Sequence, residues 1–189
     1  MSFFDFLKEI SDEISYMKED FKLNVLEDNR KKVQPKVGSV IYSVMKFPAI
    51  FNRKIINKEQ RSYPILDNFY PEHSGIYVGD GQVVQLDGSG RIEKVTPEIF
   101  INRDPNFLKD NRIYISMKNG EVYGNEEFAK RALSRVGDQI EYKLFSNNCH
   151  MFTYGCATGD FLDGPPYLSS LQADLKKIYG IDEWRLWER

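Results

Sequence analysis

The segment Leu144–Cys156 (LFSNNCHMFTYGC) contains both cysteines of the chain and one of its two histidines. Cys149 follows a Ser-Asn-Asn run that favours a helix N-cap, so a helix is predicted from near Cys149 to Gly159. N–H groups and the dipole at a helix start lower the pKa of a thiol and favour the nucleophilic thiolate. The same N–H groups could stabilise an oxyanion. Cys149 is therefore a candidate nucleophile, with Asn148 as a candidate substrate or oxyanion contact.

A cysteine nucleophile needs a base, and the chain has only two histidines. His150 is a poor partner for Cys149, because adjacent residues of a helix point about 100° apart. His73 precedes a predicted strand, Ser74–Val78, that could aim its ring. An Asp-Gly turn then predicts a hairpin, and Gln85 is polar among apolar neighbours on the returning strand. Its carbonyl could accept from one imidazole nitrogen and leave the other for the thiol.

Each of these residues also has a structural interpretation. Cys149 shares a helical face with Cys156 and could be a buried core thiol. His73 could be a surface or capping residue, and Gln85 could simply face water. Tyr77 could face the site as a substrate or oxyanion contact, or pack against the core. A zinc site made from both histidines and both cysteines lacks a C-x2-C pair, so we expect no metal and no cofactor.

Two blocks of sequence carry a family resemblance. The first runs from His73 to Gln85 (HSGIYVGDGQVVQ), and the second (LFSNNC) ends in the Asn-Cys pair at Cys149. Together and in this order they resemble the lecithin:retinol acyltransferase-like family, in the circularly permuted branch of the papain-like NlpC superfamily. Val37–Ile41 is similar to the strand that usually precedes the histidine strand, and Phe128–Val136 to the helix that usually precedes the cysteine.

The resemblance implies catalytic roles. Cys149 takes the nucleophile position, His73 the general-base position, and Gln85 the orienting position, where many members have a second histidine. The wider superfamily resembles papain-like enzymes in accepting His, Asn or Gln there. Many members read Asn-Cys-Glu-His-Phe, whereas this chain reads Asn-Cys-His-Met-Phe. That departure leaves the nucleophile intact and bears on the substrate.

The predicted fold class is α+β, and the resemblance implies a permuted papain-like (NlpC-like) fold. A small antiparallel sheet containing the His73 strand should pack on the helix that begins at Cys149. We expect residues 1–30 to form an N-terminal amphipathic helix and linker, 36–160 the catalytic domain, and 161–189 a C-terminal helical extension. Further elements are expected as strands over 37–44, 82–86, 91–95, 113–117 and 140–144, and as helices over 125–136 and from Ser169 or Ser170 to Tyr179.

The N-terminal segment could serve as a contact surface. Apolar residues over 3–24 alternate spacings of four and three and form a narrow helical stripe. The stripe could dock on the domain itself, or contact a protein partner or a second copy through residues 3–21. Peripheral membrane contact is less favoured, because this helix carries more acids than bases. Residues 45–72 are expected to form a long loop, with a lid over the site as the alternative.

Composition excludes several function classes. The net charge of −2 over 189 residues argues against a nucleic-acid binder. Two cysteines on one helix, seven positions apart, would lie about 10 Å apart, too far for a disulfide, which suggests a reducing compartment. The first residues carry acids where a signal peptide needs an apolar core. We therefore expect a cytoplasmic protein without a transmembrane segment.

Two functions from different classes follow. The first is a thiol-dependent acyl hydrolase or acyltransferase with a Cys149 thioester intermediate, for which the resemblance favours lipid esters as substrates. An amide substrate, as for a cysteine amidase or peptidase of the NlpC type, is the alternative within this class. The second is a catalytically inactive binding module that uses the N-terminal helix as its working surface.

Overall fold

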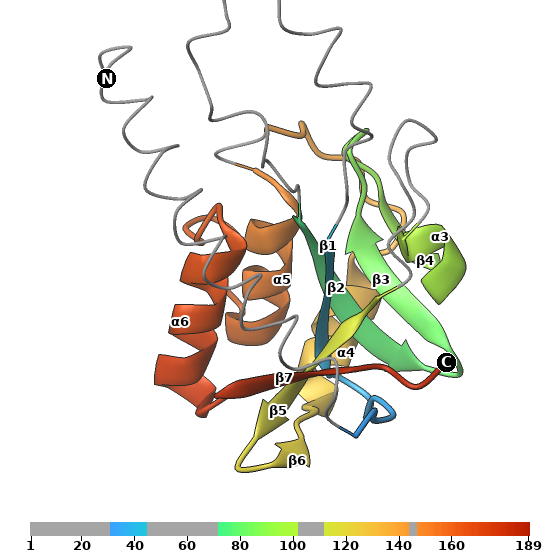
Figure 1. Ribbon diagram of the computed structural model, residues 1–189. Coiled ribbons are helices and arrows are strands. Elements are labelled where there is room, and N and C mark those ends of the chain that lie inside the picture. Colours follow the sequence, from blue (N-terminus) through green and yellow to red (C-terminus); the bar gives the residue numbers. More distant parts are fainter. Residues whose placement is uncertain (1–30, 45–71, 102–111, 144–146) are drawn as a thin grey trace, which may run out of the picture.

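The computed structural model describes residues 31–44, 72–101, 112–143 and 147–189 (Figure 1). The predicted N-terminal helix over 3–24, with its proposed contact surface, lies outside the described residues. Most of the predicted loop or lid over 45–72 lies outside them as well.

The described strands form one antiparallel sheet with the order β4-β3-β2-β1-β5-β6, and β7 pairs with β5. They are β1 (Val40–Val44), β2 (Glu72–Gly79), β3 (Gln82–Leu86), β4 (Ile92–Val95), β5 (Tyr114–Lys118), β6 (Glu121–Val122) and β7 (Glu183–Leu186). The β2–β3 hairpin turns through Asp80 and Gly81, with φ of 52° and 68°. Two positive φ values in succession are what a tight Asp-Gly hairpin turn requires.

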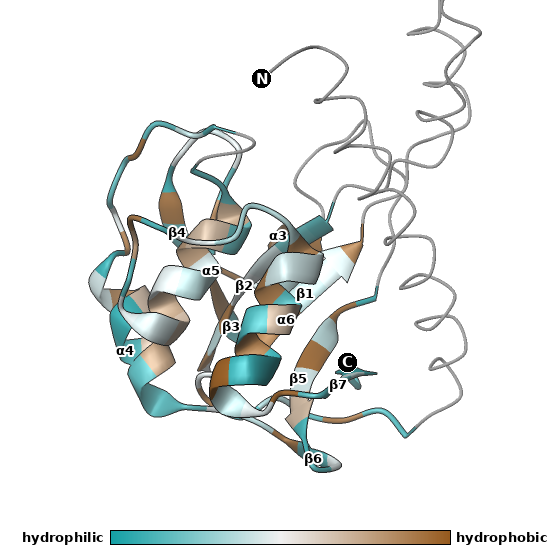
Figure 2. Ribbon diagram, turned by 90° about the vertical axis from the view of Figure 1, so that its left-hand side faces the viewer, coloured by the Kyte–Doolittle hydropathy of each residue, from teal (hydrophilic) through white to brown (hydrophobic). Residues whose placement is uncertain are grey.

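Helices cover both faces of this sheet (Figure 1). On one face lie α4 (Glu126–Ser134), α5 (Cys149–Thr158) and α6 (Leu168–Tyr179), and on the other lies the short α3 (Pro97–Ile101). Figure 2 shows the three longer helices in front of the sheet, with hydrophilic colour on α4 and α6. The fold is therefore α+β, with the sheet as the middle layer.

Two apolar clusters form because strand side chains alternate between the faces. The larger cluster lies under α4, α5 and α6 and includes Tyr42, Ile76, Val84, Phe128, Phe152 and Leu171. The smaller one lies under α3 and includes Ile41, Val83, Phe100, Ile115 and Trp187. The predicted packing of the sheet on the cysteine helix is thereby confirmed.

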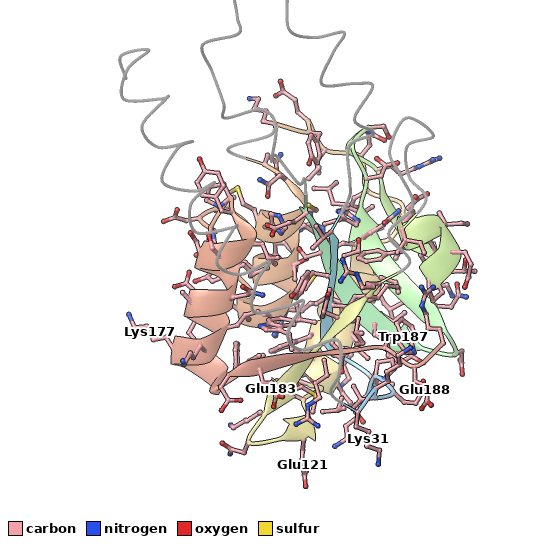
Figure 3. All side chains as sticks on the ribbon, in the orientation of Figure 1. Lys31, Glu121, Lys177, Glu183, Trp187 and Glu188 are labelled. Atoms are coloured by element: carbon pink, nitrogen blue, oxygen red, sulfur yellow. The ribbon has the colours of Figure 1, made fainter. Side chains whose placement is uncertain are left out.

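The two ends of the described chain meet at β7. Val33 forms a parallel bridge with Trp187, and the backbone of Val33 bonds to Leu186 and Glu188 at 2.9 Å each. Trp187 Nε1 also donates to Gln34 Oε1 at 3.1 Å. Figure 3 shows Trp187 and Glu188 together beside the C-terminal end of β7. Residues 33–34 thus hold the last strand against the sheet.

The predicted elements agree with the structure near the site and differ at the C-terminus. β3 has the predicted bounds, and the helix that begins at Cys149 is confirmed. The C-terminal segment is not wholly helical, because residues after α6 form β7 and join the sheet. Residues 140–143 form no strand and make only isolated bridges nearby. The short elements α3 and β6, 5 and 2 residues long, were not predicted.

The predicted helix ends shift by small amounts. α4 ends at Ser134 with Arg135 as its C-cap, rather than at Val136. α6 begins after Tyr167, which makes no side-chain cap bond, rather than at a serine cap. The residue boundaries of the three predicted regions stay a prediction. No helix of the described residues is long and apolar enough to cross a membrane.

Arg131 of α4 fastens the end of the cysteine helix. Its Nε donates to Cys156 O at 2.6 Å, and its second guanidinium nitrogen donates to Ala157 O. Ala157 O also accepts from Tyr179 Oη at 2.8 Å, which ties α6 to the same point. The last carbonyls of a helix lack partners within it, so a cation there satisfies them and suits the helix dipole.

Arg131→Met should lower the free energy of unfolding by about 2 kcal/mol, because the end of α5 loses charged donors while the apolar stem stays. Urea denaturation followed by circular dichroism would measure it. Lys130→Met is the matched control, since Lys130 is exposed and pairs with Glu127 on the helix surface; its effect should stay within about 0.5 kcal/mol. Equal effects of the two changes would contradict this role of Arg131.

Candidate active site

His73 and Gln85 are joined directly. His73 Nε2 and Gln85 Oε1 lie 2.8 Å apart, and both residues are fully buried at 0% exposure. They stand on neighbouring strands, β2 and β3, as a diagonal pair on one face of the sheet, which is within reach of long side chains. The alternative that Gln85 faces water is therefore wrong. His73 is not a surface residue either.

The imidazole of His73 packs against the ring of Phe100, with ring centroids 4.6 Å apart. Gly75 makes this approach possible, because a Cβ there would lie 2.7 Å from Val84 O and 3.1 Å from Phe100 Cε2. The short helix α3 carries Phe100 over this gap in the sheet surface. A hydrogen bond to Gln85 and an aromatic contact with Phe100 thus help to hold the ring of His73.

Cys149 is the first residue of α5 and is buried, with 3% exposure. Asn148 is the N-cap, and its Oδ1 accepts from His150 N at 3.0 Å and Met151 N at 3.1 Å. Its Nδ2 donates to Pro166 O at 2.7 Å. The side chain of Asn148 therefore builds the helix start and engages two first-turn N–H groups. Backbone N–H groups at such a helix start can stabilise an oxyanion.

Ser74 links the start of α5 to the strand that carries His73. Its hydroxyl lies 3.3 Å from Cys149 O and 2.9 Å from each of His150 Nδ1 and Thr153 Oγ1. Thr153 Oγ1 also donates to Cys149 O at 2.8 Å. The backbone of Cys149 is therefore fixed against the residue next to His73. His150 takes part in this cluster.

The two cysteines differ in surroundings. Cys156 is fully buried in the larger apolar cluster, and this burial raises the pKa of its thiol far above the ordinary range. Cys156 is therefore a core residue. Neither of the two cysteines forms a disulfide. Among the described residues, no three His, Cys, Asp or Glu side chains are placed to hold a metal ion.

The structure does not bring Tyr77 to the other candidates. Its ring packs edge-on against Trp187 at 5.3 Å, and its hydroxyl accepts from Gly81 N at 3.2 Å. Tyr77 lies four positions after His73 in β2, which corresponds to about 13 Å along the strand. Tyr77 therefore supports the far end of the hairpin and the contact with the C-terminal strand.

Glu93 was not foreseen as part of the site. It lies directly opposite Gln85 in the β3–β4 register, and its Oε1 accepts from Gln85 Nε2 at 3.0 Å. The Gly-Ser-Gly turn after β3 could have predicted this contact. Gln85 and Glu93 lie equally far before and after the centre of the turn, so a hairpin places them opposite each other.

Comparison with known families agrees with this geometry. A family model described as lecithin retinol acyltransferase matches residues 61–162, more than half of the 189-residue chain. The chain belongs to the lecithin retinol acyltransferase family. The predicted family is thereby confirmed, and the chain carries a domain of a family of acyl-transfer enzymes. No curated protein matches the chain significantly.

The matched residues of the lecithin retinol acyltransferase model include His73, Gln85 and Cys149. They extend from before β2 to just after α5. The predicted strand Val37–Ile41, of which only the end lies in β1, precedes the match, so its similarity to the family stays a prediction. α6 and β7 follow the match, although they complete the described core.

Asn148→Ala should lower the free energy of unfolding by about 1 kcal/mol, because the cap acceptor for two N–H groups is lost. Asn148→Asp keeps an acceptor oxygen at the cap and adds a charge that suits the helix start, so it should lose less. Chemical denaturation of the three proteins would measure both values. A larger loss for Asn148→Asp than for Asn148→Ala would contradict the capping role and point to the contact with Pro166 instead.

Proposed function

We propose that the chain is a cysteine-dependent acyl hydrolase or acyltransferase that forms a thioester on Cys149 and acts on lipid esters. The observation that carries this proposal is the buried hydrogen bond between His73 Nε2 and Gln85 Oε1. The next residue of the same strand, Ser74, bonds to the backbone of Cys149 at the start of its helix. Family membership supports acyl transfer as the reaction class. The arrangement supplies a nucleophile, a base and a group that holds the base.

In the proposed first step, Cys149 Sγ attacks the acyl carbonyl carbon of the substrate. His73 takes the thiol proton on Nδ1, because its Nε2 is engaged by Gln85. The negative charge that develops on the carbonyl oxygen is stabilised by the N–H of Cys149 at the helix start. His73 then protonates the leaving alkoxide, and the acyl group remains on sulfur as a thioester.

In the second step, water or an acceptor alcohol or amine attacks the thioester carbonyl. His73 removes the proton of the incoming group and returns it to the sulfur as the thioester breaks. Hydrolase and transferase activities therefore share every residue of the site and differ only in the acceptor. The departure after the cysteine, with His150 and Met151, alters the residues next to the nucleophile and bears on which substrate is accepted.

Wild-type protein incubated with an activated ester and a short-chain phospholipid should gain the mass of one acyl group on Cys149, with release of fatty acid. Intact-protein mass spectrometry would detect the adduct, and Cys149→Ala should show none. Cys156→Ala is the matched control and should acylate as the wild type does, because Cys156 is a buried core thiol.

The pattern of adducts separates the alternatives. An adduct from the activated ester but not from the phospholipid would move the substrate class to amides, as for the NlpC-type amidase. No adduct from either donor would overturn the proposal and favour the inactive binding module. In that case the contact surface predicted over residues 3–21 would be the next segment to test.

Cys149 should react with iodoacetamide faster than Cys156 at neutral pH. The helix start and the imidazole favour the thiolate of Cys149, whereas burial raises the pKa of the Cys156 thiol. His73→Ala should slow alkylation of Cys149 and leave that of Cys156 unchanged. Peptide mass spectrometry at timed intervals would give both rates. Equal rates for the two thiols would argue against an activated cysteine.

A further inference from the structure

A third side chain, Glu93, extends the pair formed by His73 and Gln85. Gln85 Nε2 donates to Glu93 Oε1 at 3.0 Å, while Gln85 Oε1 lies 2.8 Å from His73 Nε2. The β3–β4 register sets Gln85 directly opposite Glu93, so the backbone itself holds both side chains on one face of the sheet. The three side chains therefore form a continuous line of hydrogen bonds from β4 to β2.

We propose that Glu93 is a positioning residue that fixes the tautomer of His73 through Gln85. The inference rests on the proposed function, in which His73 is the base. A glutamine amide has a donor end and an acceptor end, whereas a carboxylate only accepts. Glu93 therefore holds the NH2 group of Gln85 towards itself and turns the carbonyl towards His73.

The tautomer of the histidine follows from this orientation. Because the carbonyl of Gln85 only accepts, His73 must carry its hydrogen on Nε2. The neutral ring then has its lone pair on Nδ1, which is the form that a general base for the thiol needs. With an amide alone in this position, either end could face the ring. Glu93 removes that ambiguity.

The surroundings strengthen this constraint. His73 and Gln85 are both fully buried. If the Gln85 amide flipped, bulk water could not supply the hydrogen bonds that it would lose. The Glu93 side chain is 26% exposed, and Arg91 Nε lies 3.5 Å from its other oxygen, Oε2. Glu93 thus accepts a hydrogen bond from the buried amide and forms an ion pair with a surface cation. When His73 gains a proton, the negative charge of Glu93 acts on it through the polarised amide.

The tautomer can be measured without any substrate. Imidazole 15N chemical shifts distinguish the Nε2–H form from the Nδ1–H form, and the chain has only two histidines to assign. Wild-type protein should show His73 as the Nε2–H tautomer when neutral. A neutral Nδ1–H tautomer in the wild type would overturn the proposal, whatever the variants do.

Glu93→Lys should reverse the orientation of the amide. A lysine only donates, so Gln85 should turn its carbonyl to it and present NH2 to His73. The ring must then accept at Nε2 and hold its hydrogen on Nδ1, and alkylation of Cys149 should slow by about 100-fold, as for loss of a general base. Glu93→Gln still offers an acceptor oxygen and should keep most of the rate.

A double variant and a distant control make the test specific. Gln85→Glu combined with Glu93→Lys supplies a carboxylate that accepts from both neighbours, so it should restore the Nε2–H form and most of the rate. Glu121→Lys makes the same change of charge on β6, at the opposite end of the molecule (Figure 3), and should leave the rate unchanged. A slowed rate in Glu93→Lys without a change of tautomer, or with no recovery in the double variant, would overturn the proposal.

Failure of the proposed function would look different. If the 15N shifts report the Nε2–H tautomer and its loss in Glu93→Lys, but no acyl adduct forms on Cys149, the positioning role stands and the acyl-transfer chemistry falls. If an acyl adduct forms on Cys149 but the tautomer of His73 is unchanged in Glu93→Lys, the acyl-transfer chemistry stands and the positioning role of Glu93 falls. If Glu93→Lys does not fold, Glu93→Met removes the acceptor without adding a charge and should give a mixture of both tautomers.

Discussion

Strand β2 presents successive side chains to opposite faces of the sheet, and the arrangement of the site depends on this alternation. His73 turns to the face that α3 covers, where it meets Phe100 and Gln85. Ser74, the next residue, turns to the face that α5 covers, where it bonds to the backbone of Cys149. Two neighbouring residues of one strand therefore hold the base and the start of the nucleophile helix.

Buried polar groups of this region form hydrogen bonds with one another through oxygen acceptors. Gln85 stands between His73 and Glu93, and the carbonyl of Cys149 receives the hydroxyl of Thr153. Buried polar groups without such bonds would destabilise the fold, so these networks also restrict how the side chains can be oriented. A restricted orientation is what a base needs, because only one of its two nitrogens can serve the thiol.

The cysteine helix is held at both ends by residues far away in the sequence. At its start, Asn148 caps the first turn and reaches Pro166 in the chain that leads to α6. At its end, Arg131 of α4 and Tyr179 of α6 donate to the last carbonyls. These contacts explain why α4 and α6 both pack beside α5, although α6 lies outside the residues that match the family model.

Much of this arrangement was predictable from local sequence. The Asp-Gly turn and the alternation around it fixed the β2–β3 hairpin, and the Ser-Asn-Asn run fixed the start of α5, because turn and cap chemistry act over a few residues. The acyl-transfer family followed from the His73 block and the Asn-Cys block in their order. The predicted roles of Cys149, His73 and Gln85 remain proposals that the chemical tests above address.

The tertiary structure alone decided the features that depend on contacts between distant residues. The strand β7 has a short, unremarkable pattern, and it forms because Val33 and β5 supply its hydrogen-bond partners. Alternation left open whether Tyr77 faces the site or packs against the core, and its contact with Trp187 shows that it packs at the other end of β2. Glu93 gained its contact with Gln85 only through the strand register. Local patterns set turns, caps and alternation, whereas register and docking depend on which surfaces meet when the chain folds.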